Sequence, residues 1–137
     1  MEKNLTPDKE TEKLYKTLFE KNPACMYIFD RETYEILEVN EAIIKAYGYS
    51  REEFLSMTIK DIRPAEDWEK AKFVVKNLHD EYKIGKWRHK KKNGEIIIVD
   101  IKAVKIEHKG RKAVLAIPDD ITDKEKNSKK VEEYANN

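Results

Sequence analysis

The sequence predicts an α+β domain: one small antiparallel sheet, interrupted by helices and followed by a helical exit. Three turn signals, taken in order, support this prediction. Asp30 closes an apolar run, Asn93-Gly94 separates two strand-like runs, and Asp120-Ile121-Thr122 ends the last such run. Antiparallel strands can be joined by tight turns, whereas parallel strands need long crossovers, so this order favours an antiparallel sheet.

Length and charge restrict the class of protein. The 137 residues suit one domain that folds without disulfides or metal. The net charge is +1, from 28 basic and 27 acidic residues, so no overall field selects nucleic acid or an anionic membrane. Cys25 has no partner for an internal disulfide, and no apolar run approaches the roughly 18 residues that span a bilayer. We therefore expect a cytoplasmic protein without direct membrane insertion.

An amphipathic helix is predicted at the start of the chain. Thr6 is expected to be its N-cap, with Pro7 in the first turn. Leu14 and Leu18 recur at helical spacing, and Asn22-Pro23 ends the helix.

Two short strands follow, at Cys25 to Phe29 and Ile36 to Val39, joined by a turn at Asp30 to Glu35. Asn40 is then expected to cap a helix that Gly48 stops.

Two further helices are predicted before the long strands. Ser50 and Glu53 form a capping box for a short helix, and Pro64 precedes a longer one. Apolar residues three and four positions apart indicate the packed face of the longer helix, namely Trp68, Ala71, Val75 and Leu78.

Asn93-Gly94 predicts a type I′ hairpin between strands at Tyr82 to Lys92 and Glu95 to Glu107. Lys109-Gly110 turns the chain into a last strand at Arg111 to Ile117.

Both faces of the last two strands carry apolar residues. One face carries Ile97, Val99, Ile101, Ala103, Val114 and Ala116, and the other carries Ile96, Ile98, Val104, Ile106, Ala113, Leu115 and Ile117. A sheet with helices on one face normally has a wet second face, so this second face is expected to be covered. The leading helix of this chain or of a partner subunit is the available cover. The alternative is that isolated apolar residues stay exposed, as is normal on protein surfaces.

Catalytic and metal-binding patterns do not stand out. His79, His89 and His108 have no paired Cys or Glu-x-x-His spacing, and the chain has no Gly-rich phosphate loop and no Gly-x-Ser-x-Gly. We expect no enzyme activity, no catalytic residue and no metal site.

A basic run offers one route to nucleic acid. Arg88 and Lys90 to Lys92 lie beside Trp87, and phosphate contacts need basic residues while a stacked base needs an aromatic ring. The run covers a single strand of a charge-balanced domain, so a solvated hairpin arm whose lysines discourage edge pairing is favoured. No nucleic-acid partner is expected.

The ordered set of motifs resembles the PAS domain family over roughly Leu18 to Lys126. The residues that carry the resemblance are Asn22-Pro23, Asp30, Val39-Asn40, Gly48-Tyr49-Ser50, Pro64, Asn93-Gly94 and Asp120-Ile121-Thr122. The resemblance implies a five-stranded antiparallel sheet with helices on one face and a small cavity between them. It also implies a sensor or relay of two-component signal transduction, most often fused to a histidine kinase.

The resemblance also bears on cofactors. In the haem-binding branch of the family, a histidine of the long helix ligates iron, and Ala65 to Leu78 contains no histidine. The flavin-binding branch needs a cysteine in the short segment before that helix, where this chain has Met57 to Ile62. Neither haem nor flavin is expected, although another small molecule could occupy the cavity.

Strand alternation gives a candidate cavity lining. The inward residues from the strands would be Met26, Ile28, Trp87, His89, Ile97, Val99, Ile101, Val114 and Ala116, with Tyr47, Phe54, Ile59, Trp68 and Val75 from the helices. Apolar walls with a few polar groups suit a small-molecule site. The same residues also describe a filled core, and both alternatives remain open. His89 is expected to be a satisfied histidine at the core edge rather than a ligand contact.

The end of the sheet is the expected signal exit. Ile121 should anchor the strand end, while the side chains of Asp120 and Thr122 bond to nearby backbone and fix the outgoing helix.

The predicted organisation is a flanking helix at 1–21, a PAS domain at 22–123 and the start of a linker helix at 124–137. The expected function is a sensor or relay domain whose effector follows in the chain, with a homodimer through the leading helix and the outer sheet face. The alternative is a ligand-free dimerisation module.

Overall fold

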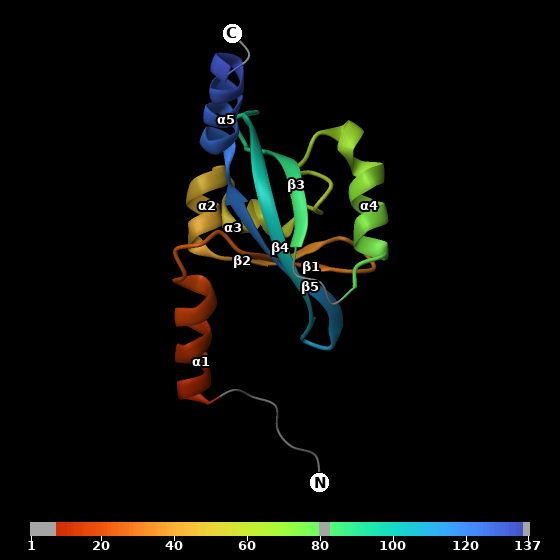
Figure 1. Ribbon diagram of the computed structural model, residues 1–137. Helices are drawn as coiled ribbons and strands as arrows, with labels where there is room; N and C mark the ends of the chain where they lie inside the picture. The colour runs from red at the N-terminus through yellow and green to blue at the C-terminus, as the bar shows by residue number, and fades with distance from the viewer. Residues whose placement is uncertain (1–7, 80–82, 136–137) are drawn as a thin grey trace.

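The computed structural model describes residues 8–79 and 83–135. Its centre is a five-stranded antiparallel sheet with the strand order β2-β1-β5-β4-β3. The strands are β1 Tyr27–Asp30, β2 Ile36–Val39, β3 Lys83–Lys90, β4 Ile96–His108 and β5 Arg111–Asp120. The chain enters at one edge with β1 and β2, crosses to β3 at the other edge, and returns through β4 to β5 in the middle (Figure 1). The predicted α+β fold is therefore confirmed.

The connection from β2 to β3 carries the helices that cover the inner face of the sheet. They are α2 Glu41–Tyr47, α3 Arg51–Leu55, the 3-10 turn η2 Ala65–Asp67 and α4 Trp68–Lys76. Buried residues of α2, α3 and α4 share one apolar cluster with β1, β3, β4 and β5. This cluster is the main core.

The predicted caps of α2 and α3 are confirmed. The Asn40 side chain accepts a hydrogen bond from the backbone N–H of Ile43, and Gly48 ends α2 in the left-handed region at φ 87°. Ser50 and Glu53 exchange the two hydrogen bonds of a capping box. These local signals position the helical layer before any tertiary contact is considered.

The leading helix is divided into α1 Lys9–Tyr15 and a π-helical turn, η1 Lys16–Glu20. Its N-cap is Asp8, whose side chain accepts a hydrogen bond from Thr11, and the predicted cap residues Thr6 and Pro7 lie outside the described residues. In Figure 1 this helix stands away from the sheet. None of the α1 residues is buried.

The outer face of the sheet is nevertheless covered at one point. Phe19 of η1 is 5% exposed and packs in a second apolar cluster with Met26, Ile28 and Ala113, against which Leu37, Ile106, Leu115 and Ile117 also pack. The expectation of a covered second face is confirmed for Phe19. Leu14 and Leu18 remain 57% and 58% exposed.

The hairpin turn at Asn93-Gly94 differs from the prediction. A type I′ turn needs positive φ at both central residues, but at Asn93-Gly94 only Gly94 has it, at 89°. Lys91 and Glu95 close a three-residue loop there, in which the Lys91 N–H donates to the Glu95 carbonyl at 2.9 Å. The predicted type I′ turn at Asn93-Gly94 is therefore wrong, because the loop is one residue longer.

The positive-φ pair lies instead at the next turn, where Lys109 has φ 49° and Gly110 has φ 80°. These two residues separate His108 from Arg111, which face one another across β4 and β5. The dihedral signs and the two-residue length are those of a type I′ hairpin.

The last helix, α5 Thr122–Ala135, leaves the end of β5 and projects away from the sheet (Figure 1). Among the residues that the structure describes, no helix combines the length and the apolar character needed to cross a membrane.

Candidate functional site

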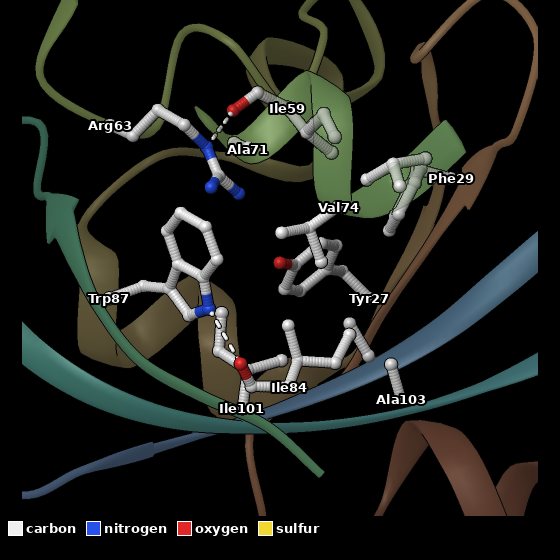
Figure 2. Close-up of a pocket in the computed structure, with 12 residues that line it drawn as sticks. Tyr27, Phe29, Ile59, Arg63, Ala71, Val74, Ile84, Trp87, Ile101 and Ala103 are labelled. Carbon is white, nitrogen blue, oxygen red and sulfur yellow. Dashed lines mark hydrogen bonds between the residues drawn. The ribbon is translucent and has the colours of Figure 1, made fainter. Parts of the chain in front are cut away.

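A small cavity of about 30 Å³ lies within the main core, between α4 and the inner face of the sheet. Most of its lining is apolar, as the close-up in Figure 2 shows. The lining consists of Tyr27, Phe29, Ile59, Arg63, Ala71, Val74, Val75, Ile84, Trp87, Ile101, Ala103 and Ala116. A water molecule needs about 10–15 Å³ of such space, so the cavity has room for about two.

The predicted cavity residues divide into groups. Those that line the cavity are Ile59, Val75, Trp87, Ile101 and Ala116. Those that are buried in the same core without lining the cavity are Tyr47, Phe54, His89, Ile97, Val99 and Val114. Trp68 packs at the edge of the core, with its ring edge-on to Tyr34 at a centroid distance of 5.2 Å. Most of the predicted set therefore fills the core, and a smaller part surrounds the cavity.

Met26 and Ile28 were placed on the wrong face. Both lie in the outer cluster with Phe19, whereas Tyr27 and Phe29 face the main core. Met26 to Phe29 are four consecutive apolar residues, so alternation alone could not decide which pair of side chains points inward. Because the outer face is also covered, either pair of side chains would be buried, so burial does not decide between them.

Seven lining residues were not in the predicted cavity set, namely Tyr27, Phe29, Arg63, Ala71, Val74, Ile84 and Ala103, and Arg63 is the charged one among them. It is 6% exposed, and its Nε donates a hydrogen bond to the Ile59 carbonyl at 2.9 Å. Its guanidinium carbon lies 5.9 Å from the centre of the Trp87 ring. Arginine is almost never fully buried unless paired, so a sequence pattern gives no reason to place it inside.

Tyr27 and Trp87 supply the other polar atoms of the cavity. In Figure 2 the Tyr27 hydroxyl and the terminal nitrogens of Arg63 face the same space. Burial raises the pKa of Tyr27, and the charge of Arg63 opposes that increase, so the phenol stays protonated. The Trp87 ring nitrogen donates to the Ile84 carbonyl at 3.2 Å, which fixes the ring against the lining.

His89 lies deeper than expected, with no exposed surface. Its Nδ1 is 2.6 Å from the Tyr47 hydroxyl, and within the described residues its Nε2 has no hydrogen-bond partner. Burial, and then the charge of Arg63, lower the pKa of His89 well below its ordinary value. The ring is therefore neutral at pH 7 and is a core residue.

The basic arm of β3 is occupied by ion pairs. Arg88 binds the Asp67 carboxylate through two nitrogens at 2.9 and 2.7 Å, and Lys92 pairs with Glu53 at 3.0 Å. Lys91 lies 3.4 Å from Glu95. These contacts fit the interpretation of the arm as a solvated surface strand.

The exit junction connects β5, β4 and α5 through one set of hydrogen bonds. The Asp120 side chain accepts hydrogen bonds from the Thr122 N–H at 3.0 Å and from the Thr122 hydroxyl at 2.6 Å. That hydroxyl in turn accepts the Ile98 N–H at 2.9 Å, and the Ile121 N–H donates to the Ile98 carbonyl. Ile121 is buried beneath the junction. The first turn of α5 is therefore bonded to the middle of the sheet.

Within the described residues, no group of three or more His, Cys, Asp or Glu side chains could hold a metal ion. The cavity has one cationic group, one phenol and apolar walls. This arrangement can bind a small molecule, but it places no nucleophile beside a base.

Comparison with known proteins fits this geometry of a central sheet, a small cavity and a helical exit. The model of the PAS domain family matches residues 23–123, so the chain belongs to the PAS domain family. PAS domains are sensory modules of signal transduction.

Among known proteins, the chain is 28% identical over 119 residues to the methyl sulfide methyltransferase-associated sensor of Methanosarcina acetivorans. The match covers 86% of this chain but 12% of that protein, so the chain spans about an eighth of its relative's length.

Solved structures support the fold. The PAS domain of an HTR-like protein from Haloarcula marismortui has a TM-score of 0.72 at 23% identity, covering 82% of this chain and 93% of that one. A domain of the sensory box sensor histidine kinase/response regulator from Geobacter sulfurreducens has a TM-score of 0.65 at 25% identity, covering 80% and 93%.

Proposed function

We propose that this PAS domain is the input module of a larger cytoplasmic signalling protein, most simply a histidine kinase, and that a small molecule in the cavity sets its output. The observation that carries the proposal is the cavity itself, which has apolar walls and a buried cationic group. A pocket of that composition is the usual starting point for ligand recognition.

The path from the cavity to the exit is short. Ile101 lines the cavity on β4, and Ile98 of the same strand bonds to both Ile121 and Thr122. Ala116 lines the cavity on β5, and Asp120 ends that strand. A ligand that shifts β4 relative to β5 would therefore change the hydrogen bonds that orient α5. A ligand that binds one of these two arrangements more tightly than the other would shift the equilibrium between them.

The relatives agree with this role. The relative from Methanosarcina acetivorans is named as a sensor, and the domain from Geobacter sulfurreducens belongs to a sensor histidine kinase/response regulator. Because this chain spans only part of the first relative, an effector domain in the same polypeptide fits the proposal.

A ligand-free dimerisation module is the second candidate, and the leading helix favours it. Leu14 and Leu18 are more than half exposed on the helix that stands away from the sheet. Burying a leucine side chain contributes roughly 1.5–3 kcal/mol, so pairing of two such helices would stabilise a homodimer. A sensor can also be a dimer, so the two candidates differ in whether the cavity is used.

Native mass spectrometry of freshly purified protein tests the proposal. The expected result is an added mass that disappears on denaturation and is missing from Val74→Phe, a substitution that fills the cavity. The surface substitution Phe73→Leu, one position earlier on α4, is the matched control and should retain the added mass. An added mass that persists in Val74→Phe, or none in protein from its native host, would contradict a ligand-gated input module.

A further inference from the structure

Arg63 lies beside the cavity with little exposed surface, and the described residues offer it no carboxylate partner. Its Nε bonds to the Ile59 carbonyl, but within the described part of the chain the guanidinium forms no ion pair. Its two terminal nitrogens point into the cavity, toward the space in front of the Tyr27 hydroxyl (Figure 2). A guanidinium that is 6% exposed and has no ion pair among the described residues is stabilised by an anion, so the cavity suits an anionic partner.

Asp67, a carboxylate that feels the charge of Arg63, is engaged elsewhere. Both of its oxygens are bonded to Arg88, which accounts for most of the lowering of its pKa. Lys70 places a second positive charge near the cavity, with its Nζ 5.1 Å from the centre of the Trp87 ring. The electrostatic surroundings of the cavity are therefore positive on the side of Arg63 and Trp87.

We infer that the cavity binds a small aliphatic monocarboxylate of acetate size, with its carboxylate on Arg63 and Tyr27. This inference rests on the proposed function, in which a small molecule occupies the cavity. The planar guanidinium presents paired N–H donors that match the two oxygens of a carboxylate. The Tyr27 hydroxyl provides a further donor on the same side.

Size and polarity select the rest of the ligand. Room for about two water molecules restricts the ligand to very few non-hydrogen atoms, which excludes nucleotides, haem and flavin from the cavity as it stands. Ile84 and Ala103 line the cavity on the side away from the guanidinium, and they suit a methyl group better than a second charged group. A dicarboxylate would place its second charge against these residues.

Fluorescence of Trp87 can report this binding directly. The chain has two tryptophans, and Trp68→Phe leaves Trp87 as the single one. Sodium acetate is titrated into this protein at constant ionic strength, with acetamide as the neutral ligand of the same shape. We expect a saturable change with acetate, and binding of acetamide at least roughly tenfold weaker, because a charged hydrogen-bond pair is about twice as strong as a neutral one.

Two arginine variants separate the guanidinium from general charge effects. Arg63→Met should weaken acetate binding at least roughly tenfold, whereas Arg51→Met, which removes a half-buried arginine of α3 that pairs with Glu38, should leave it unchanged. Equal binding of acetate and acetamide, or an unchanged affinity in Arg63→Met, would overturn the inference. If Arg63→Met does not fold, the comparison of acetate with acetamide, repeated in Tyr27→Phe, still decides it.

The outcomes also separate this inference from the proposed function. Saturable binding of acetamide alone, lost in Val74→Phe, would refute the carboxylate while supporting a ligand-binding cavity. No fluorescence change with formate, acetate, propionate or acetamide, together with no added mass in native mass spectrometry, would refute both.

Discussion

Asn40 connects four segments of the chain, and its replacement should be unusually costly for a helix cap. Its side-chain oxygen accepts the N–H groups of Met26 at 3.0 Å and Ile43 at 3.2 Å. Its amide nitrogen donates to the carbonyls of Phe19 at 3.0 Å and Ala24 at 2.7 Å. The residue is 1% exposed, so water cannot replace these bonds.

The cost of Asn40→Ala can be estimated from two of these bonds. Loss of the cap costs about 0.5–2 kcal/mol, and the buried Met26 N–H left without a partner costs about 1–3 kcal/mol. We expect a loss of about 2–5 kcal/mol in the free energy of unfolding, measured by urea denaturation with circular dichroism. Asn77→Ala is the matched control, because Asn77 is exposed and, among the residues that the structure describes, its side chain bonds only to the Phe73 carbonyl; it should cost less than about 1 kcal/mol.

Asn40→Asp tests the reasoning more sharply. Aspartate caps helices as well as asparagine does, so a simple cap would tolerate the change. Here it would place a carboxylate oxygen against the carbonyls of Phe19 and Ala24, and we expect a loss at neutral pH at least as large as that of Asn40→Ala. Stability equal to the wild-type protein would show that the amide donor contributes nothing and that Asn40 is only a cap.

Three further predictions concern titration, assembly and colour. Because folding holds the pKa of His89 below its unfolded value, stability should be complete above about pH 6.5 and fall by up to about 1.4 kcal/mol per unit below it. Urea titrations at several pH values should show this slope in His79→Gln but not in His89→Gln. Leu14→Ser with Leu18→Ser should shift a dimer to monomer in analytical ultracentrifugation and lower the melting temperature, because loss of the dimer removes its contribution to the folded state. The purified protein should be colourless and remain so with haemin or flavin; a stoichiometric Soret or flavin spectrum would contradict this.

Local signals predicted the framework well because each one has a local cause. Asn40 and Ser50 begin helices through bonds to residues three positions away, and Gly48 ends one through its backbone freedom. The alternation along β4 was equally informative, since its inner and outer residues differ in burial as expected. These features predict the elements but not the order of the strands in the sheet.

Nonlocal features could not be predicted in the same way. The face of β1 that points inward depends on the packing of Phe19 on the outer cluster, and four consecutive apolar residues conceal that choice. Arg63 stands between Ile62 and Pro64 with nothing nearby to mark it as buried. Its position follows from the Ile59 carbonyl and the Trp87 ring, which are brought together only by the fold.

We propose that this PAS domain relays a change in its sheet to a following effector through the Asp120–Thr122 junction. The most direct test fuses the domain to a histidine kinase core and measures autophosphorylation of Asp120→Ala against Asp119→Ala, an exposed aspartate one position earlier. The junction cap is worth about 0.5–2 kcal/mol, so both variants should stay folded. We predict that Asp120→Ala changes kinase output while Asp119→Ala matches the wild-type fusion. Equal output from both folded variants would show that the junction only caps a helix and carries no signal.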